Sequence, residues 1–182
     1  GVDYRIVPLA DYEPDILYQK QVEAYYADPE LNRPVGRFGN AADKWGLANW
    51  MAAAVADEAD ADVGFYHIGG VRLDSIPAGG VSAAKVYGLE PFGTLVAEME
   101  MTPAQMRRMI VSKYNDPVNA KEAHRIDLIS TMPYVIVTDA ADNALDVQFP
   151  KLREGRKYKV AVSDYIYRNY KDMEYTGGEI TD

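Results

Sequence analysis

The sequence predicts a layered α/β (α+β) domain in which helices pack against sheets. Its 182 residues are enough for one domain with a full core. Hydrophobic residues make up 48% and charged residues 26%, proportions that are typical of globular domains. Helix-like and strand-like segments both occur but do not alternate strictly along the chain, which favours packed layers over a simple series of βαβ units.

The N-terminal part of the chain is expected to form an arm followed by a helix. Residues 1–14 are assigned to the arm, whose first ten residues are either a short strand or ordered chain. Residues 15–26 show a mixed but helical spacing of apolar side chains, so the main domain is expected to span 15–182 and to begin with this helix. Prolines and glycines interrupt residues 31–40, which predicts extended chain and turns.

Three further helices are predicted. Residues 41–58 are rich in helix formers and repeat apolar residues at i, i+3 and i+4, and a short helix is expected over 81–87. Thr102 and Pro103 indicate another helix start, because threonine caps a first turn and proline is tolerated there. The buried face of that helix is expected to consist of Met106, Met109 and Ile110.

Strand-like runs lie between and after these helices. They are expected at 61–66, 94–101, 126–132, 134–138, 144–149 and 158–162. Residues 139–143 have the composition of a hairpin turn. The last strand leads into an aromatic-rich segment, 164–172.

Composition excludes several classes of function. The net charge of -9, from 28 acidic and 19 basic residues, argues against a protein that tracks nucleic-acid phosphates. The absence of cysteine excludes disulfides and thiolate chemistry. No apolar run approaches the length of a transmembrane segment. The chain opens on Gly1, and we expect that an export signal has been removed.

The sequence contains no recognised catalytic pattern. Its two histidines, His67 and His124, lie in different segments without the spacing of metal ligands. No phosphate-binding loop and no GxSxG elbow are present, although a Ser-His-Asp arrangement stays open. We therefore expect no catalysis by this chain alone and no cofactor or metal within it.

Residues suited to ligand binding are better represented. Gly69 and Gly70 let backbone N–H groups approach a ligand, and Arg72 can bind a phosphate or carboxylate with its guanidinium fork. Phe92 lies in a Pro-Phe-Gly loop and Tyr165 follows a strand, so their rings could sandwich a flat heterocycle. The alternative is that the glycines form a simple turn and the rings belong to the core.

These pieces occur in the order found in a known family. The chain resembles the C-terminal, nucleotide-binding domain of the 5′-nucleotidases over about residues 15–175, on four segments. Residues 47–54 (LANWMAAA) are similar to the family's LGNLxxDA, and 62–72 (DVGFYHIGGVR) to a strand followed by NGGGIR. Residues 76–95 (IPAGGVSAAKVYGLEPFGTL) parallel IPAGxIT…DVYxVxPFGN, and 158–165 (YKVAVSDY) parallel YxVAxNDF.

The resemblance implies a fold of mixed sheets with packed helices, like the 5′-nucleotidase C-terminal domain, and a set of ligand contacts. Phe92 and Tyr165 would clamp the two faces of the base. Arg72 would contact the ribose-phosphate region, as part of the loop with Gly69 and Gly70. Asp172 is the residue nearest to the family's GGDG aspartate, which holds the ribose hydroxyls.

Departures from the family pattern fall mainly on the sugar and phosphate contacts. His67 and Ile68 replace the asparagine and first glycine of NGGGIR, and Ala53 replaces the aspartate of the helix motif. Residues 170–173 replace GGDG and lose its glycines. His67 either donates to or accepts from a base edge, or satisfies neighbouring backbone groups.

The resulting hypothesis is a stand-alone nucleoside- or nucleotide-binding domain. About 15 residues precede the matched region, so a separate metallophosphoesterase chain, carrying two divalent metals, is expected to perform hydrolysis in nucleotide catabolism. The resemblance implies a periplasmic, cell-surface or secreted location. The alternative is a non-catalytic exported binding or scaffold module with a degenerate ligand site, and no nucleic-acid partner is expected in either case.

Overall fold

The computed structural model describes residues 2–118, 121, 125–170 and 172–181. Its helices are η1 (Leu9–Asp11), α1 (Ile16–Tyr26), α2 (Pro29–Asn32), α3 (Lys44–Glu58), η2 (Ile68–Gly70), α4 (Ala83–Leu89), α5 (Pro103–Tyr114) and α6 (Asp164–Asn169). Its strands are β1 (Pro34–Phe38), β2 (Ala42–Asp43), β3 (Val63–His67), β4 (Ser75–Ile76), β5 (Gly79–Ser82), β6 (Val96–Met101), β7 (Leu128–Ser130), β8 (Val135–Thr138), β9 (Ala144–Gln148), β10 (Tyr158–Ser163) and β11 (Thr176–Thr181).

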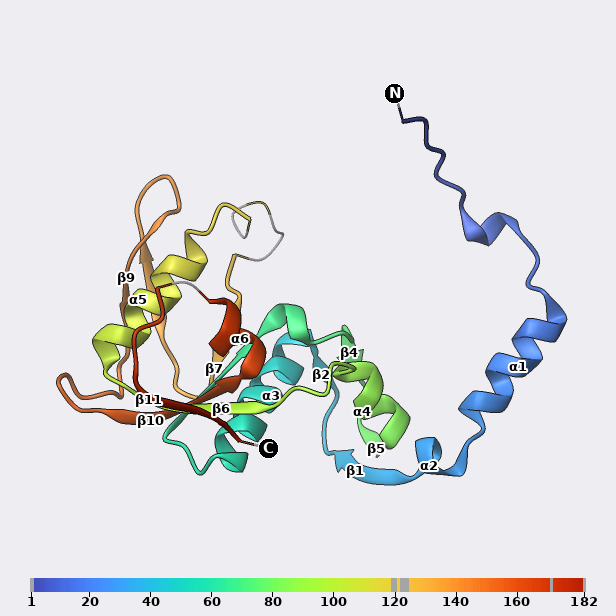
Figure 1. Cartoon of the computed structure of the whole chain (residues 1–182), viewed down its shortest axis with the longest axis horizontal. Coiled ribbons are helices and arrows are strands. Elements are labelled where there is room, and N and C mark those ends of the chain that lie inside the picture. The colour runs from blue at the N-terminus through green and yellow to red at the C-terminus, as the bar shows by residue number, and fades with distance from the viewer. Residues whose placement is uncertain (1, 119–120, 122–124, 171, 182) are drawn as a thin grey trace.

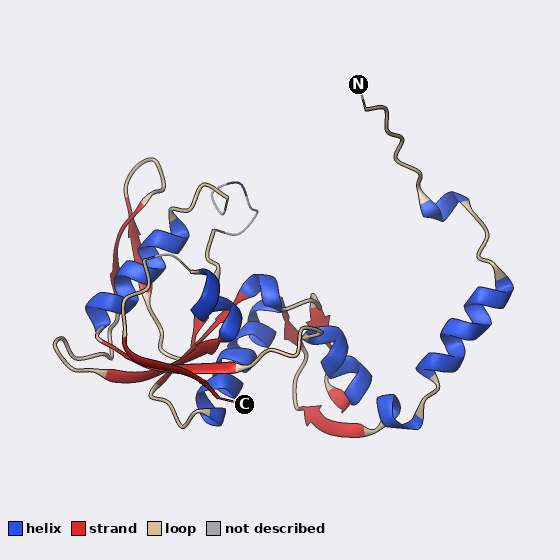
Figure 2. Cartoon of the chain, in the orientation of Figure 1, coloured by secondary structure: helices blue, strands red, loops and turns tan. Residues whose placement is uncertain are grey.

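A five-stranded mixed sheet with the order β11-β6-β10-β3-β7 forms the centre of the domain. The β10 and β3 strands are parallel, while the other neighbouring pairs are antiparallel. Three two-stranded sheets accompany it: β1-β5 and β2-β4 lie on the side of α4, and β8-β9 lies beside α5 (Figure 1 and Figure 2). The predicted fold class, a layered α/β domain of mixed sheets and packed helices, is confirmed.

Each face of the central sheet has its own hydrophobic core. On one face, α5 and the β8-β9 hairpin cover side chains that include Met99, Met101 and Val160, while α3 covers the other face (Figure 1). The α3 helix approaches the sheet so closely that a Cβ at Gly64 would lie 2.1 Å from the carbonyl oxygen of Ala52. The result is a three-layer arrangement around one sheet.

Most predicted elements are confirmed. The segment 41–58 contains α3, and Thr102 caps α5 in a capping box with Gln105, with Met106, Met109 and Ile110 buried on its inner face. The predicted hairpin at 134–149 is β8-β9. Several assignments were incomplete. The aromatic-rich segment after β10 begins with a helix, α6, and the edge strand β11 was not predicted. The short strands β2, β4 and β5 were not predicted either, and the helix expected over 81–87 begins at Ala83, after β5.

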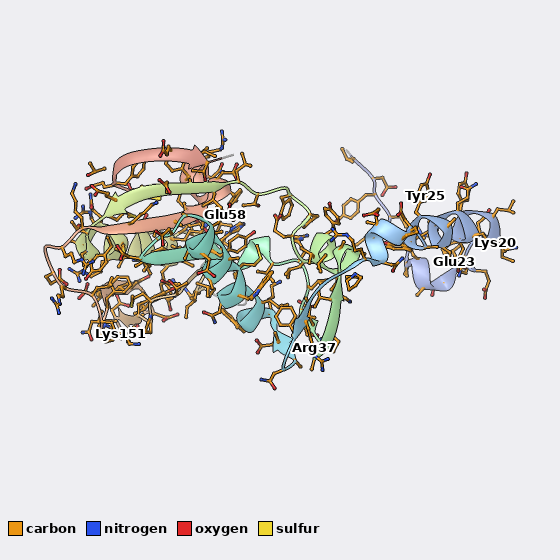
Figure 3. The ribbon with its side chains drawn as sticks, turned by 90° about the horizontal axis from the view of Figure 1, so that it is seen from below. Lys20, Glu23, Tyr25, Arg37, Glu58 and Lys151 are labelled. Atoms are coloured by element: carbon orange, nitrogen blue, oxygen red, sulfur yellow. The ribbon has the colours of Figure 1, made fainter. Side chains whose placement is uncertain are left out.

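The N-terminal segment extends away from the rest of the chain (Figure 1). Its helix α1 begins after Asp15, whose carboxylate accepts hydrogen bonds from the backbone N–H groups of Leu17 and Tyr18. Figure 3 labels Lys20, Glu23 and Tyr25 on this helix, and every described residue from 2 to 30 is exposed. Among the first ten residues, those described hold no strand. Among the described helices, none combines the length and hydrophobicity that a membrane span needs.

Candidate functional site

Three segments that are distant in sequence meet at one edge of the central sheet. Because β3 and β10 are parallel, their C-terminal ends lie at the same edge, and β6 begins there because it runs antiparallel to β10. The loop 67–72, the loop 90–95 and the helix α6 are therefore brought together by the sheet topology itself.

Backbone hydrogen bonds connect these segments. The N–H of Arg72 donates to the carbonyl of Leu89, just before the 90–95 loop, at 2.9 Å. Asp164 then ties that loop to α6, because its N–H donates to the Leu95 carbonyl at 2.9 Å and its Oδ1 accepts from the Leu95 N–H at 3.3 Å. The geometry of the site is thus set by main-chain contacts.

The 90–95 loop is shaped so that the ring of Phe92 projects outward. The Glu90 carboxylate accepts from the N–H of Phe92 at 3.2 Å and from the N–H and hydroxyl of Thr94 at 3.4 and 2.8 Å. Gly93 has a φ of +61°, in the left-handed region that favours glycine. Phe92 is consequently 60% exposed, unusual for a phenylalanine in an ordered loop.

Tyr165 comes from the first turn of α6. Ser163 caps this helix by accepting a hydrogen bond from the Ile166 N–H at 3.3 Å. Ile166 points into the core, which leaves Tyr165 on the outer side with half of its surface exposed. Arg168 and Asn169 follow at i+3 and i+4, so they lie on the same side of the helix as Tyr165.

A cavity of about 470 Å³ lies between these segments. Its lining residues are His67, Gly69, Phe92, Gly93, Thr94, Asp164, Tyr165, Arg168 and Asn169. Four residues proposed from the sequence, His67, Gly69, Phe92 and Tyr165, therefore line one cavity. The remaining lining residues were not proposed from the sequence. Asp164, Arg168 and Asn169 lie on α6, which the sequence did not indicate, and Gly93 and Thr94 follow Phe92 in its loop.

His67 lies between two tyrosines. Its ring stacks on Tyr165 with centroids 4.5 Å apart and planes at 20°, and on Tyr66 at 5.2 Å and 30°. Its Nδ1 is buried without a hydrogen-bond partner among the described residues. Burial lowers the pKa of His67 and raises that of Tyr66 to about 12, so both rings are uncharged at neutral pH. The side chain acts as a support for Tyr165 in this structure.

The two glycines of the loop have different surroundings. A Cβ at Gly70 would lie 2.6 Å from His67 Cε1 and 2.9 Å from Tyr66 Cε1, so this glycine makes room for the aromatic stack. A Cβ at Gly69 would meet only His67 Cδ2, at 3.7 Å, and Gly69 lines the cavity. Only Gly69 leaves its backbone open toward a ligand.

Arg72 and Asp172 lie outside the lining of this cavity. Arg72 Cζ lies 5.9 Å from the centroid of the Phe92 ring, and its Nη1 donates to the Gly69 carbonyl at a long 3.5 Å. Asp172 lines a neighbouring cavity of about 300 Å³ and accepts a hydrogen bond from the Ser112 hydroxyl at 2.8 Å. Tyr165 and Asn169 line both cavities. The contribution of Asp172 to sugar binding stays a prediction.

The described residues contain no group of three or more His, Asp or Glu side chains that could hold a metal ion. His124, the second histidine of the chain, lies outside the described residues.

Solved structures with the same fold include proteins described as two nucleotidases and a sulfate thiohydrolase. A 5′-nucleotidase precursor from Thermus thermophilus has a TM-score of 0.67 at 17% identity, over 93% of this chain and 38% of that protein. The NAD nucleotidase of Haemophilus influenzae has a TM-score of 0.60 at 17% identity, over 87% and 33%. A sulfate thiohydrolase, also from Thermus thermophilus, has 0.61 at 14% identity, over 94% and 35%.

At these identities the structural likeness establishes the fold alone, and this chain spans between 33% and 38% of the length of the three proteins. No curated protein matches the sequence. The sequence model described as "5′-nucleotidase, C-terminal domain" matches residues 30–175, which is most of the chain and includes every residue of the cavity. The chain therefore belongs to the 5′-nucleotidase C-terminal domain family.

Proposed function

We propose that this chain binds a nucleoside or nucleotide, with the base held between Phe92 and Tyr165. One observation carries the proposal: two largely exposed rings, from segments distant in sequence, line the same cavity. Exposing such rings to water is unfavourable, so their retention at a cavity indicates that a flat apolar group covers them. The family to which the chain belongs makes a nucleobase the first candidate.

The dimensions and chemistry of the cavity support this proposal. Its volume of about 470 Å³ lies within the usual range for small-molecule sites. Stacking of a base on an aromatic side chain contributes roughly 1–3 kcal/mol. His67 already covers one face of Tyr165, which leaves the other face for a ligand and holds the ring in a fixed orientation.

We further propose that hydrolysis belongs to a metallophosphoesterase domain outside this sequence, which would carry two divalent metals. This chain would present the nucleoside portion of the substrate to that domain, whether on the same chain or a separate one. The family resemblance also favours an exported location, in the periplasm or at the cell surface, and fractionation of cells that produce the protein tests this directly.

A second candidate is a non-catalytic binding or scaffold module whose ligand is another flat aromatic molecule. Two observations favour it. His67 lines the main cavity with its ring occupied in an aromatic stack, and Asp172 lies outside that cavity, bonded to Ser112. One matched structure is a sulfate thiohydrolase, so the fold by itself does not specify a nucleotide ligand.

Titration calorimetry with adenosine, AMP and the unrelated aromatic compound indole separates the two candidates. For Phe92→Ala and Tyr165→Ala we expect adenosine binding to weaken about 5- to 100-fold each, the equivalent of one lost stack. Tyr87→Ala is the matched control, because Tyr87 is 64% exposed on α4 and does not line the cavity. Equal affinity of the wild type for indole and for adenosine would favour the second candidate.

The catalytic half of the proposal has its own test. The chain is added to a metallophosphoesterase domain that lacks a C-terminal domain, and phosphate release from nucleoside monophosphates is measured. We expect release to rise with added wild-type chain and to rise less with Phe92→Ala. No increase over the phosphoesterase alone would contradict the proposal that this chain presents the substrate to such a domain. The proposal that this chain binds nucleosides would still be decided by the titration.

A further inference from the structure

Arg168 is a cationic side chain in the cavity that the family motifs do not assign. It lies on α6 one turn after Tyr165, and both residues line the cavity. Residue 168 lies between the last matched segment (158–165) and the positions that correspond to GGDG (170–173), so no family motif assigns it. Among the described arginines, Arg168 is the one that lines this cavity.

The guanidinium of Arg168 is held at one edge. Its Nε lies 3.3 Å from Asp164 Oδ2, and the other carboxylate oxygen of Asp164 accepts from the Leu95 N–H. Asp164 is therefore fixed by the loop that carries Phe92, and it fixes Arg168 in turn. Among the described residues, the closest ion-pair contact of Arg168 is made through Nε, and neither Nη atom forms a hydrogen bond.

This arrangement differs from that of Arg107. Arg107 directs both Nη atoms to Glu154, at 2.6 and 2.7 Å, which uses its fork completely. Arg168 has its Nε occupied and its fork open, and an open fork binds the oxygens of a phosphate in bidentate fashion. Asp164 offsets part of the charge, but it does not use the Nη donors.

We propose that Arg168 is a specificity-determining residue that contacts the phosphate of a nucleoside phosphate whose base is stacked on Tyr165. This inference rests on the proposed function, because it needs a base in the cavity. A single helical turn separates the residue that holds the base from the residue that holds the anion. The site would then distinguish AMP from adenosine, which the aromatic clamp alone does not.

The test compares AMP with adenosine on four proteins: wild type, Arg168→Ala, Arg168→Lys and Arg108→Ala. Arg108 is the matched control, because its exposure is similar (52% against 58%) and it forms a comparable ion pair, with Glu174, away from the cavity. For Arg168→Ala we expect about a 10-fold loss of AMP affinity and less than a 2-fold change for adenosine. Arg168→Lys should recover part of the loss, since it keeps the charge without the fork.

Salt provides a second readout. Raising the ionic strength to about 0.5 M should reduce the preference for AMP over adenosine in the wild type but not in Arg168→Ala, because exposed charges are screened. Equal losses for both ligands in Arg168→Ala, or no loss, overturn the inference and leave the nucleoside site intact. Wild-type protein that binds neither adenosine nor AMP overturns both proposals, and circular dichroism confirms that the variants are folded.

Discussion

At the scale of single residues, the site is organised by a row of three rings. Tyr66, His67 and Tyr165 stack in sequence, and His67 and Tyr165 line the cavity. Tyr66 is fully buried and His67 largely so, which means that the exposed ring is supported by two that cannot move far. A preorganised ring loses little conformational freedom when a base stacks on it, so more of the stacking energy contributes to affinity.

Gly70 provides the sharpest residue-scale prediction. In Gly70→Ala the new methyl group would overlap the rings of His67 and Tyr66, so at least one ring of the stack would have to shift. We expect a loss of about 1–3 kcal/mol in unfolding free energy, as for other overpacked sites, together with weaker adenosine binding. Chemical denaturation and titration calorimetry measure the two effects.

Gly69→Ala is the control for this prediction. Its Cβ would be in ordinary contact with His67, at 3.7 Å, and no positive φ requires glycine there, so we expect a change below about 0.5 kcal/mol. If the two alanine variants are equally stable, the aromatic stack does not limit the space at Gly70.

At the scale of helices and strands, predictability followed the strength of local signals. The α5 helix carries its own start signal in Thr102 and Pro103, and α3 has a long run of helix formers, so both were recognised. Edge strand β11 contains two adjacent glycines and no alternating apolar pattern, and it is a strand because it pairs with β6. A strand that depends on pairing with a distant segment has no pattern in its own sequence that would predict it.

The candidate site shows the same division. Phe92 and Tyr165 were proposed from the family motifs, and they line one cavity. Arg168 and Asn169 were missed, because they lie on the same side as Tyr165 only if this segment is a helix. Its six residues, rich in tyrosine and isoleucine, have a composition that resembles a strand. His67 was expected either to contact a base edge or to satisfy neighbouring backbone groups, and its packing against Gly70 depends on ring positions that the sequence cannot specify.

The 90–95 loop supports an element-scale prediction. Glu90 accepts three hydrogen bonds within the loop, so Glu90→Ala should release the turn that presents Phe92. We expect adenosine affinity to fall by about 5-fold or more, since ordering the loop would then oppose binding. Glu154→Ala is the control, because it also removes an acidic side chain with two hydrogen bonds, both to Arg107 and outside the cavity. Equal affinities of the two variants would show that Glu90 does not position Phe92.

At the scale of the whole molecule, a packed domain is preceded by an exposed arm, residues 2–30, which is longer than the predicted arm (1–14) because it includes α1. The two cores on the faces of the central sheet draw all of their buried residues from positions after 46. The arm contributes none, although α1 carries an apolar stripe at i, i+4, i+7 and i+8, formed by Tyr18, Val22, Tyr25 and Tyr26. A stripe of this kind is typical of a helix that packs on another surface, and an 11-residue helix is marginal in water without one. The metallophosphoesterase domain invoked above is one surface that would cover it.

Because the arm buries nothing, removing residues 2–28 should leave the domain intact. We expect the melting temperature to change by less than about 2 °C, since a change of 1 kcal/mol corresponds to roughly 2–4 °C for a chain of this size. Adenosine affinity should also be unchanged, because the cavity takes no residue from the arm. A truncation that removes 2–38 is the contrasting variant: it deletes β1, which pairs with β5 through Arg37 and Gly80, and should lower the melting temperature by several degrees. A large loss of stability on removal of 2–28 alone would mean that the arm folds back onto the domain in solution.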